Sequence, residues 1–385
     1  MPSLGPSSAV SVTRRAPQRR PGRAAARSAK SAPPVLAELV RGGIVESRHR
    51  GHVVQVSQSG MLEKGIGDPD MPVTLRSAVK PFAIIPLIES GAADDLDVTP
   101  VELAVMAASH AGEDLHVRTL QALFRRAGIS QTLLACGSEG MPLDERTAAR
   151  LARDGEAAGP IRHMCSGFHA ASLLLSRFAG WSLDEYDRPD HPSQLAARAA
   201  VASVFGVRSE LLRTAVDDCG LLTYIFPLVE VARAFCLLAD PTGSEAPGAA
   251  ALAPYLQRVR DAMLAAPEMV GGTAEMLDTR LMRTLPGRIV AKSGAEGLRG
   301  IGLLPGWGGR GGTATGVVVR IEDGDGAGRA NRAVTCEALS QLGALDDRVL
   351  VALAAHHRPA THSPRGELIA ETVAAFELAP ISELI

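Results

Sequence analysis

The sequence predicts an α/β protein of the α+β type, in which an antiparallel sheet is flanked by helices. Three observations lead to this prediction. Strand patterns lie toward both ends of the chain, at residues 52–61, 288–294 and 315–324. Helical periodicity fills the middle, so a helical region at about 99–265 is expected as an insertion between sheet segments. The last two strand patterns are close in sequence, which favours antiparallel pairing.

Local patterns predict the first elements in order. Residues 52–61 (HVVQVSQSGM) read as a strand, and residues 65–67 as a turn. A helix over 76–90 follows an extended lead-in at 72–74. Two helical segments are expected within 99–127, because a Thr-Pro-x-Glu cap opens the first and Gly112 separates it from the second.

Helical periodicity then continues along the chain. Helices are predicted at 143–154, 166–179, 193–205, 226–239, 249–265, 330–342 and 347–356. Residues 294–316 hold ten glycines but lack the Lys-Ser/Thr ending of a phosphate loop. This stretch is expected to be a flexible or tightly turning loop.

Composition limits the class of protein. Apolar residues make up 46% of the 385 residues, enough for a sizeable core. Residues 1–34 hold seven basic and no acidic side chains and are expected to be a disordered tail, with 35–385 as the folded domain. The rest of the chain is acidic, which argues against nucleic-acid binding, and no apolar run is long enough to cross a membrane. The five cysteines, an odd number, indicate a reducing, cytoplasmic location.

Three lysine and serine positions suit proton transfer. Only four of the 40 basic residues are lysines, and arginine cannot release its proton near neutral pH, so a reactive amine is one reason to keep a lysine. Ser77 and Lys80 are three residues apart in an apolar stretch, where a neutral lysine can activate a serine on the same helix face. Lys292 ends an apolar strand before a Ser-Gly turn, as in acyl-transfer enzymes. A surface helix pair and a surface strand end are the alternatives.

Two further clusters carry polar side chains. Ser109, His110 and Glu113 follow an apolar helix, where they are either chemical groups or capping groups of a helix end. Glu46 lies among charged residues in RGGIVESRHRGH, which suits a substrate-facing strand end and equally a turn followed by an edge strand.

Cysteines and their neighbours form a last cluster. Cys165 and His169 are four residues apart, and Asp217 and Cys219 are two apart. Thiolate, carboxylate and imidazole groups are zinc ligands. No C-x-x-C pair is present, so buried free cysteines are the alternative.

Eleven short blocks occur in a fixed order: RGGIVESRHRG, RSAVKPF, ESGA, AASHAGEDLH, ACGSEGMP, MCSGFHA, HPSQ, DDCGLLT, PEMVGG, AKSGAEG and VRIEDGD. This series resembles the L-asparaginase II family, typified by the inducible rhizobial enzyme, over about residues 39–350. The resemblance implies a fold similar to serine β-lactamases and glutaminases, and a homodimer with one site in each subunit. It also implies hydrolysis of L-asparagine to L-aspartate and ammonia.

The resemblance assigns roles to residues of this chain. Ser77 and Lys80 match the first of two Ser-Lys tandems of the family, and Ser109 and Lys292 match the second. The family also has a metal-binding group near the substrate, which is matched here by Cys165, Asp217 and Cys219. The lysine of that group is Phe168 in this chain, which removes a ligand and a charge. No cofactor is required, and zinc is the metal that the resemblance suggests.

The resulting hypothesis is an amidohydrolase acting on L-asparagine or a close small amide. Lys80 deprotonates Ser77, Ser77 attacks the carboxamide, and Ser109 and Lys292 relay protons. The candidates for substrate binding are Arg76, whose planar fork suits a carboxylate, with Glu46, His110, Cys165, His169 and Asp217. A serine hydrolase of a β-lactam or another small amide is one alternative. A catalytically altered amino-acid- or amide-binding protein is the other.

Overall fold

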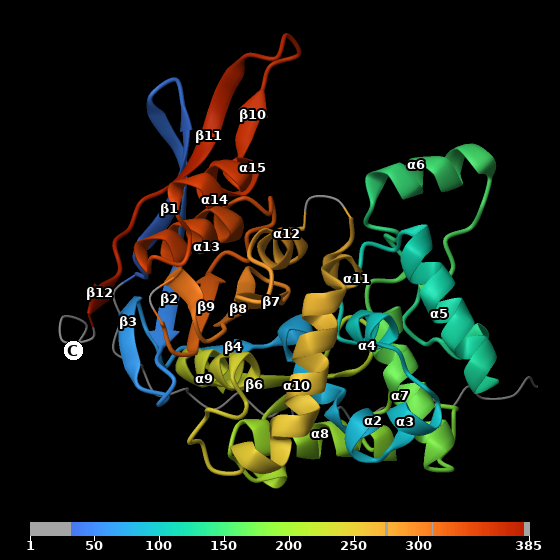
Figure 1. Cartoon of the computed structure of the whole chain (residues 1–385). Coiled ribbons are helices and arrows are strands. Elements are labelled where there is room, and N and C mark those ends of the chain that lie inside the picture. Colours follow the sequence, from blue (N-terminus) through green and yellow to red (C-terminus); the bar gives the residue numbers. More distant parts are fainter. Residues whose placement is uncertain (1–31, 274–275, 310, 381–385) are drawn as a thin grey trace, which may run out of the picture. The chain divides into compact units, whose positions relative to one another are not determined.

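The computed structural model describes residues 32–273, 276–309 and 311–380. By its internal contacts the chain divides into two units, Met1–Ala32 and Pro33–Ile385. The tail predicted over 1–34 lies outside the described residues except for its last three positions. All the elements named below belong to the second unit (Figure 1).

The main sheet has nine strands, and every pair in it is antiparallel. Its path runs β10 (Ala360–His362), β11 (Leu368–Ala374), β1 (Val35–Arg41), β2 (Ile44–Val56), β9 (Thr315–Ile321), β8 (Leu298–Leu303) and β7 (Ile289–Ser293). Off this path, β3 (Leu62–Ile66) pairs with β2 and with β12 (Ala379–Pro380). The predicted fold class, an antiparallel sheet flanked by helices, is confirmed (Figure 1).

Helices and a small second sheet fill the rest. The α-helices are α1 (Lys80–Ala83), α2 (Ile85–Glu89), α3 (Ala92–Asp95), α4 (Pro100–Met106), α5 (Asp114–Ala127), α6 (Glu145–Asp154), α7 (Ser166–Phe178), α8 (Pro192–Val204), α9 (Leu228–Ala239), α10 (Ala249–Ala265), α11 (Pro267–Gly271), α12 (Leu277–Thr284), α13 (Ala330–Gln341), α14 (Asp347–Ala352) and α15 (Ala354–His357). Short 3-10 turns are η1 (Arg76–Val79), η2 (Gln131–Leu133), η3 (Pro160–Arg162), η4 (Ser209–Leu211) and η5 (Trp307–Gly309). The second sheet is β4 (Pro72–Thr74), β6 (Leu222–Pro227) and β5 (Thr214–Val216).

The main sheet separates two apolar cores. Val290 and Val318 point into the larger core, which is shared with α9 and the helices between β4 and β7. Ile289 and Val317 point into a second core shared with α12 and α13. Because successive side chains of a strand alternate between faces, β7 presents its residues to both cores in turn.

The glycine-rich stretch 294–316 contains a strand, so its prediction as a loop is wrong over β8. A Cβ atom at Gly300 would lie 2.0 Å from the Phe235 ring, and one at Gly316 would lie 1.9 Å from the Ala232 carbonyl oxygen. Glycine is therefore required on these strands because α9 packs directly on their backbone. A close helix contact, not a turn, explains these two residues.

Other predicted elements have shifted or broken boundaries. The strand predicted over 52–61 ends at Val56, and β3 covers most of the turn predicted at 65–67. The helix predicted over 76–90 is three short elements, η1, α1 and α2, with Pro81 and Pro86 near the starts of the last two. A proline cannot donate the backbone hydrogen bond that would continue the preceding helix.

Local end signals give the correct boundaries farther on. Thr99 and Glu102 form the predicted capping box at the start of α4. Gly112 has a φ of +77° and separates α4 from α5, as predicted. The observed break leaves residues 107–113 outside any helix or strand, and this segment contains Ser109.

Candidate active site

Side chains from three separate segments meet at one buried hydroxyl group, that of Ser109. Lys80 begins α1, Ser109 follows the end of α4, and Lys292 lies on β7. Ser77 lies on η1, one turn before Lys80. The two lysines are 1% and 0% exposed, and the two serines are 9% and 8% exposed. Buried amines beside hydroxyl groups, with no carboxylate bound to either amine among the described residues, are a reactive arrangement.

The Ser109 hydroxyl lies between the two amines. Its Oγ is 2.9 Å from Lys292 Nζ and 3.2 Å from Lys80 Nζ. A hydroxyl can donate one hydrogen bond while it accepts another, so it can pass a proton from one amine to the other. The backbone fixes this position, because the Ser109 N–H donates to the Val270 carbonyl at 3.1 Å.

Lys80 has three hydrogen-bond acceptors around its Nζ. These are the Ala108 carbonyl oxygen at 2.7 Å, Ser109 Oγ at 3.2 Å and Cys165 Sγ at 3.2 Å. Three is the number of N–H donors of a lysine ammonium group. The Phe168 ring centroid lies 5.8 Å from the same Nζ. Lys80 is therefore held by contacts that direct it toward Ser109.

Lys292 is in a different environment. Its Nζ donates to the carbonyl oxygen of Ser293 at 2.7 Å, and Ser109 Oγ is its other close neighbour. Burial, and then the charge of Lys80, hold the pKa of Lys292 well below its ordinary value. A neutral amine carries a lone pair, so Lys292 can accept the Ser109 proton.

Ser77 follows a residue in a rare backbone conformation. Arg76 has a φ of +48°, in the left-handed region that non-glycine residues seldom occupy. Its N–H donates to Thr223 Oγ1 at 2.8 Å, and the Leu75 N–H donates to the Tyr224 carbonyl at 2.9 Å. The β4–β6 pairing thus leads directly into the turn that carries Ser77. In the part of the chain that the structure describes, Ser77 Oγ has no hydrogen-bond partner, so the hydroxyl is free to meet a substrate.

The Arg76 guanidinium is ion-paired. Its Nε donates to Asp217 Oδ1, and its Nη2 donates to Asp218 Oδ2. Asp217 is largely buried, whereas the Asp218 side chain is 89% exposed. Arg76 and Asp217, both predicted to bind substrate, are therefore brought together beside Ser77. Part of the arginine fork is already occupied by these carboxylates.

His110 is fully buried and faces away from solvent. Its Nδ1 accepts the Gly112 N–H at 3.1 Å, and its Nε2 lies 2.9 Å from Ser166 Oγ. The ring stacks on His116 with centroids 4.7 Å apart. Burial, and then His116 and Lys80, hold its pKa well below the ordinary histidine value. These contacts make His110 a neutral support for the segment that carries Ser109.

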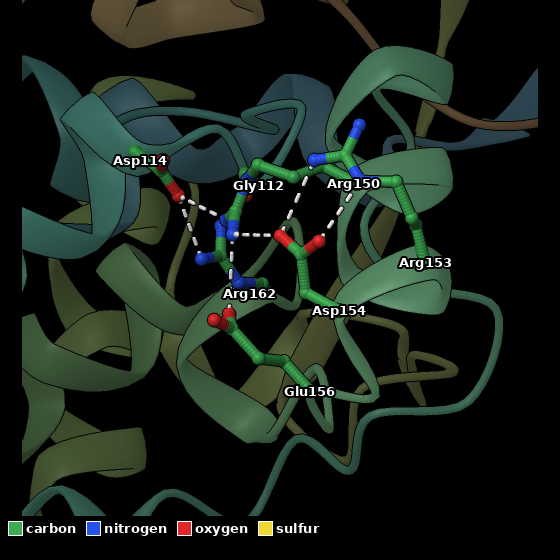
Figure 2. Close-up of polar contacts among 7 residues, drawn as sticks. All are labelled: Gly112, Asp114, Arg150, Arg153, Asp154, Glu156 and Arg162. Carbon is green, nitrogen blue, oxygen red and sulfur yellow. Dashed lines mark hydrogen bonds and ion pairs between the residues drawn. The ribbon is translucent and has the colours of Figure 1, made fainter.

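A charged cluster also holds this segment at Gly112 (Figure 2). Arg162, which is 8% exposed, donates to the Gly112 carbonyl at 2.8 Å and to Asp114 Oδ1 at 2.7 Å. Arg150 on α6 donates to the same Asp114 oxygen at 3.0 Å. The hydrogen bond from Arg162 is the main reason that the pKa of Asp114 is lowered. The cluster fixes the chain between Ser109 and α5.

The sequence of this chain matches one known protein family over most of its length. The family model of L-asparaginase II matches residues 37–374. The chain belongs to the L-asparaginase II family. Membership supports an amidohydrolase. A comparison with curated proteins finds no match.

Solved structures show a distant likeness. A probable glutaminase from Bacillus subtilis, complexed with 6-diazo-5-oxo-L-norleucine, is 13% identical with a TM-score of 0.36, over 78% of this chain and 86% of that chain. A protein described as Mglu is 16% identical with a TM-score of 0.34, over 77% of this chain and 68% of that chain. Likenesses of this size assign no site in this asparaginase-family chain.

The zinc group that the resemblance suggests does not fit the donors present. The Cys219 thiol donates a hydrogen bond to Cys165, which lowers the pKa of Cys165 and raises that of Cys219. Lys80 also donates to Cys165, while Arg76 takes Asp217. Among the described residues, no group of three or more His, Cys, Asp or Glu side chains is placed to hold a metal ion. The predicted set of Cys165, Asp217 and Cys219 is therefore corrected to a pair of cysteines beside a lysine.

His169 and Glu46 are not at the Ser109 hydroxyl. His169 is buried, its Nδ1 is 2.6 Å from the Tyr186 hydroxyl, and burial lowers its pKa to about 3. Glu46 pairs with Arg41 at 3.0 Å near the tip of the β1–β2 hairpin. That hairpin projects away from α4 in Figure 1, so the described residues give no support to the substrate role predicted for Glu46.

Some supporting residues carry no sequence signal. Asp278, which is 1% exposed, accepts the Ser293 N–H at 2.8 Å and the Ser293 hydroxyl at 2.7 Å, and it pairs with Arg299. This holds the end of the strand that carries Lys292. Like Thr223, Asp278 stands in an ordinary stretch of sequence, so only the folded chain reveals its part.

Over the described residues, no helix is both long and apolar enough to cross a membrane.

Proposed function

We propose that this chain hydrolyses L-asparagine to L-aspartate and ammonia through a serine activated by lysine. The observation that carries the proposal is the Ser109 hydroxyl between two buried amines, 2.9 and 3.2 Å away. Membership of the L-asparaginase II family supports the same chemistry. Amide hydrolysis needs a nucleophile, a proton acceptor and a proton donor for the leaving ammonia, and these side chains can supply all three.

The proposed first step is attack by Ser77 on the side-chain carboxamide. Lys80 first passes a proton through the Ser109 hydroxyl to the neutral amine of Lys292. Ser77 Oγ then forms a bond to the carboxamide carbon while its own proton passes to the Lys80 amine. In the structure Lys80 Nζ contacts the hydroxyl of Ser109, whereas the sequence pairs Lys80 with Ser77. Catalytic hydrogen bonds, here the one between Lys80 and Ser77, are often long until substrate binds. The Ser77 backbone N–H, which no described carbonyl accepts, is a candidate donor to the oxyanion.

Collapse of the tetrahedral intermediate requires a proton on the leaving nitrogen. We assign its delivery to Ser109, which is re-protonated through the neighbouring lysines. The carbon–nitrogen bond breaks, ammonia leaves, and a Ser77 ester remains. Water then attacks the ester, gives its proton to the same relay, and releases L-aspartate with Ser77 restored.

Ser109 is the rival nucleophile, and one observation favours it. Its hydroxyl already contacts Lys292, whose pKa is held well below the ordinary value. In that arrangement Lys292 is the base, and Ser77 assists. Trapping an acyl-enzyme and locating the modified serine by mass spectrometry separates the two assignments.

The substrate's charged end is assigned to the ion pair beside Ser77. The free N–H groups of Arg76 can take the α-carboxylate, and Asp217 can take the α-ammonium. Arg76 directly precedes Ser77 in sequence, and the ion pair with Arg76 holds Asp217 close to the same place. This leaves the carboxamide to point toward the lysines.

We further propose a cytoplasmic homodimer that needs no cofactor. Exposed apolar side chains near the projecting hairpins support a partner surface: Ile44 is 72% exposed, Leu368 58% and Val351 76%. All five cysteines are free and buried, which suits a reducing compartment. L-Asparagine is the proposed small-molecule partner, and neither nucleic acid nor a membrane is expected as one.

The test is ammonia release from L-asparagine by the purified chain. Wild-type protein is expected to release ammonia, and Ser77→Ala and Ser109→Ala are each expected to lose at least 100-fold in kcat. A wild-type protein that binds L-asparagine without releasing ammonia would contradict the enzyme and support an amino-acid-binding role. Full activity in Ser77→Ala would refute Ser77 as the nucleophile.

A further inference from the structure

A cavity of about 400 Å³ lies on the side of β7 opposite the catalytic lysines. It is bounded by the β7–β8 turn at residues 293–298 and by the start of α13 with the loop before it. Lys292 points from β7 toward Ser109, whereas Ser293, the next residue, turns toward Asp278 on α12. The cavity is thus separate from the site described above.

Most polar groups in the cavity wall are satisfied by the protein. Asp325 accepts the backbone N–H groups that begin α13, including those of Ala330 and Asn331 at 3.0 and 2.8 Å. The Asn331 side chain accepts from Arg299 Nε at 2.9 Å and donates to the Gly297 carbonyl at 2.8 Å. The helix start is therefore already capped and attracts no ligand by itself.

Two charged groups that border the cavity make no hydrogen bond or ion pair with any described residue. Arg332 forms no ion pair or hydrogen bond with any described residue, and its Nε is buried without an acceptor. Glu296, an exposed residue of the β7–β8 turn, also makes no hydrogen bond or ion pair with a described residue; its Oε2 lies against Gly324, and Arg320 is the charged group that acts on it. A buried guanidinium N–H without an acceptor is costly unless water or an anion satisfies it.

We propose that this cavity is a second binding site for a free α-amino acid, with its carboxylate on Arg332 and its ammonium on Glu296. Arg332 on α13 and Glu296 on the β7–β8 turn border the cavity from two sides, and their opposite charges match the two charges of a zwitterion. The planar guanidinium fork suits a carboxylate. The ligand tested is L-aspartate, and that choice alone depends on the proposed function, which makes L-aspartate the product.

A short chain of contacts joins this wall to the catalytic amine. Arg299 lines the cavity and pairs with Asp278, and Asp278 accepts two hydrogen bonds from Ser293. The Ser293 carbonyl oxygen in turn accepts from Lys292 Nζ at 2.7 Å. Occupation of the cavity is therefore expected to add a non-competitive component to inhibition by L-aspartate.

The test is calorimetric titration of the full chain with L-aspartate. Wild-type protein is expected to bind one equivalent more than Arg332→Ala, and Glu296→Gln is expected to weaken that extra equivalent at least tenfold. The matched control is Arg348→Ala, since Arg348 is an exposed arginine on α14 outside the cavity. It should bind like wild type. Circular dichroism and thermal unfolding establish that each variant is folded.

The outcomes separate this proposal from the proposed function. If the catalytic site does not bind L-aspartate, wild type binds one equivalent and Arg332→Ala binds none, which still supports the cavity site. Equal stoichiometry in wild type and Arg332→Ala overturns it, as does wild-type affinity in Glu296→Gln. In the kinetic arm, Arg332→Ala should show purely competitive inhibition with an unchanged uninhibited rate, and a retained non-competitive component also counts against the proposal.

Discussion

The hydroxyl of Thr223 is expected to hold the catalytic turn in its rare conformation. Thr223 is 1% exposed, and its Oγ1 accepts the N–H of Arg76 at 2.8 Å. Arg76 has a φ of +48° and directly precedes Ser77. Thr223→Val keeps the size and branching of the side chain but removes the acceptor. It therefore tests this single hydrogen bond.

The size of the effect follows from what the substitution leaves behind. A largely buried N–H without an acceptor costs about 1–3 kcal/mol, in the same range as holding a non-glycine residue in the left-handed region. The free energy of unfolding should therefore fall by about 1–3 kcal/mol. If the same free energy must be supplied to return the relaxed turn to its active conformation, kcat should fall by about 5- to 150-fold.

The assay combines urea unfolding with kcat and KM for L-asparagine. Thr223→Ser is the control, because it restores a hydroxyl at the same place and should recover most of kcat. A purely structural role would lower the free energy of unfolding of Thr223→Val and leave kcat unchanged in both variants. Wild-type kcat in a folded Thr223→Val protein would refute the link between this hydrogen bond and the position of Ser77.

Three further predictions concern the lysine site and the packing behind it. Lys292→Met should keep the fold and lower kcat by about 10²- to 10⁴-fold, measured as ammonia release. Because burial and Lys80 lower the pKa of Lys292, its neutral form grows as pH rises, so kcat/KM should rise with pH through a midpoint below 10.5; a flat profile that matches Lys292→Met would contradict this. Gly300→Ala places a Cβ 2.0 Å from the Phe235 ring and should cost about 1–3 kcal/mol in chemical unfolding. Gly326→Ala, with open space around it, should be close to neutral, and equal losses in the two would refute the packing argument.

The parts of the fold with their own local signals can be predicted from the sequence. The capping box at Thr99 fixes the start of α4, and long periodic stretches give α5 and α10 within a few residues. Strands that depend on distant partners cannot be predicted this way. The sequence of β8, LRGIGL, has glycines where a strand usually has side chains, and only the contact with α9 explains them.

The same distinction between local signals and distant contacts applies to the residues of the site. The scarcity of lysine and the apolar surroundings single out Lys80 and Lys292, and the structure brings both to Ser109. The sequence pairs Lys80 with Ser77 because it assumes one continuous helix. In the folded chain η1 ends where α1 begins, and Lys80 Nζ reaches the carbonyl of Ala108 and the hydroxyl of Ser109 instead. Side-chain direction at such a junction depends on the opposite wall of the site.

Buried arginines and buried lysines have different partners in this chain. Arg162 and Arg299 each pair with a carboxylate, a role that needs a permanent charge and a planar fork. Lys80 and Lys292 surround a hydroxyl and bind no carboxylate among the described residues. An ammonium group can lose its proton when it is buried, whereas a guanidinium group cannot. In a chain that uses arginine almost everywhere else, two lysines at one hydroxyl are therefore best explained by a need to exchange protons there.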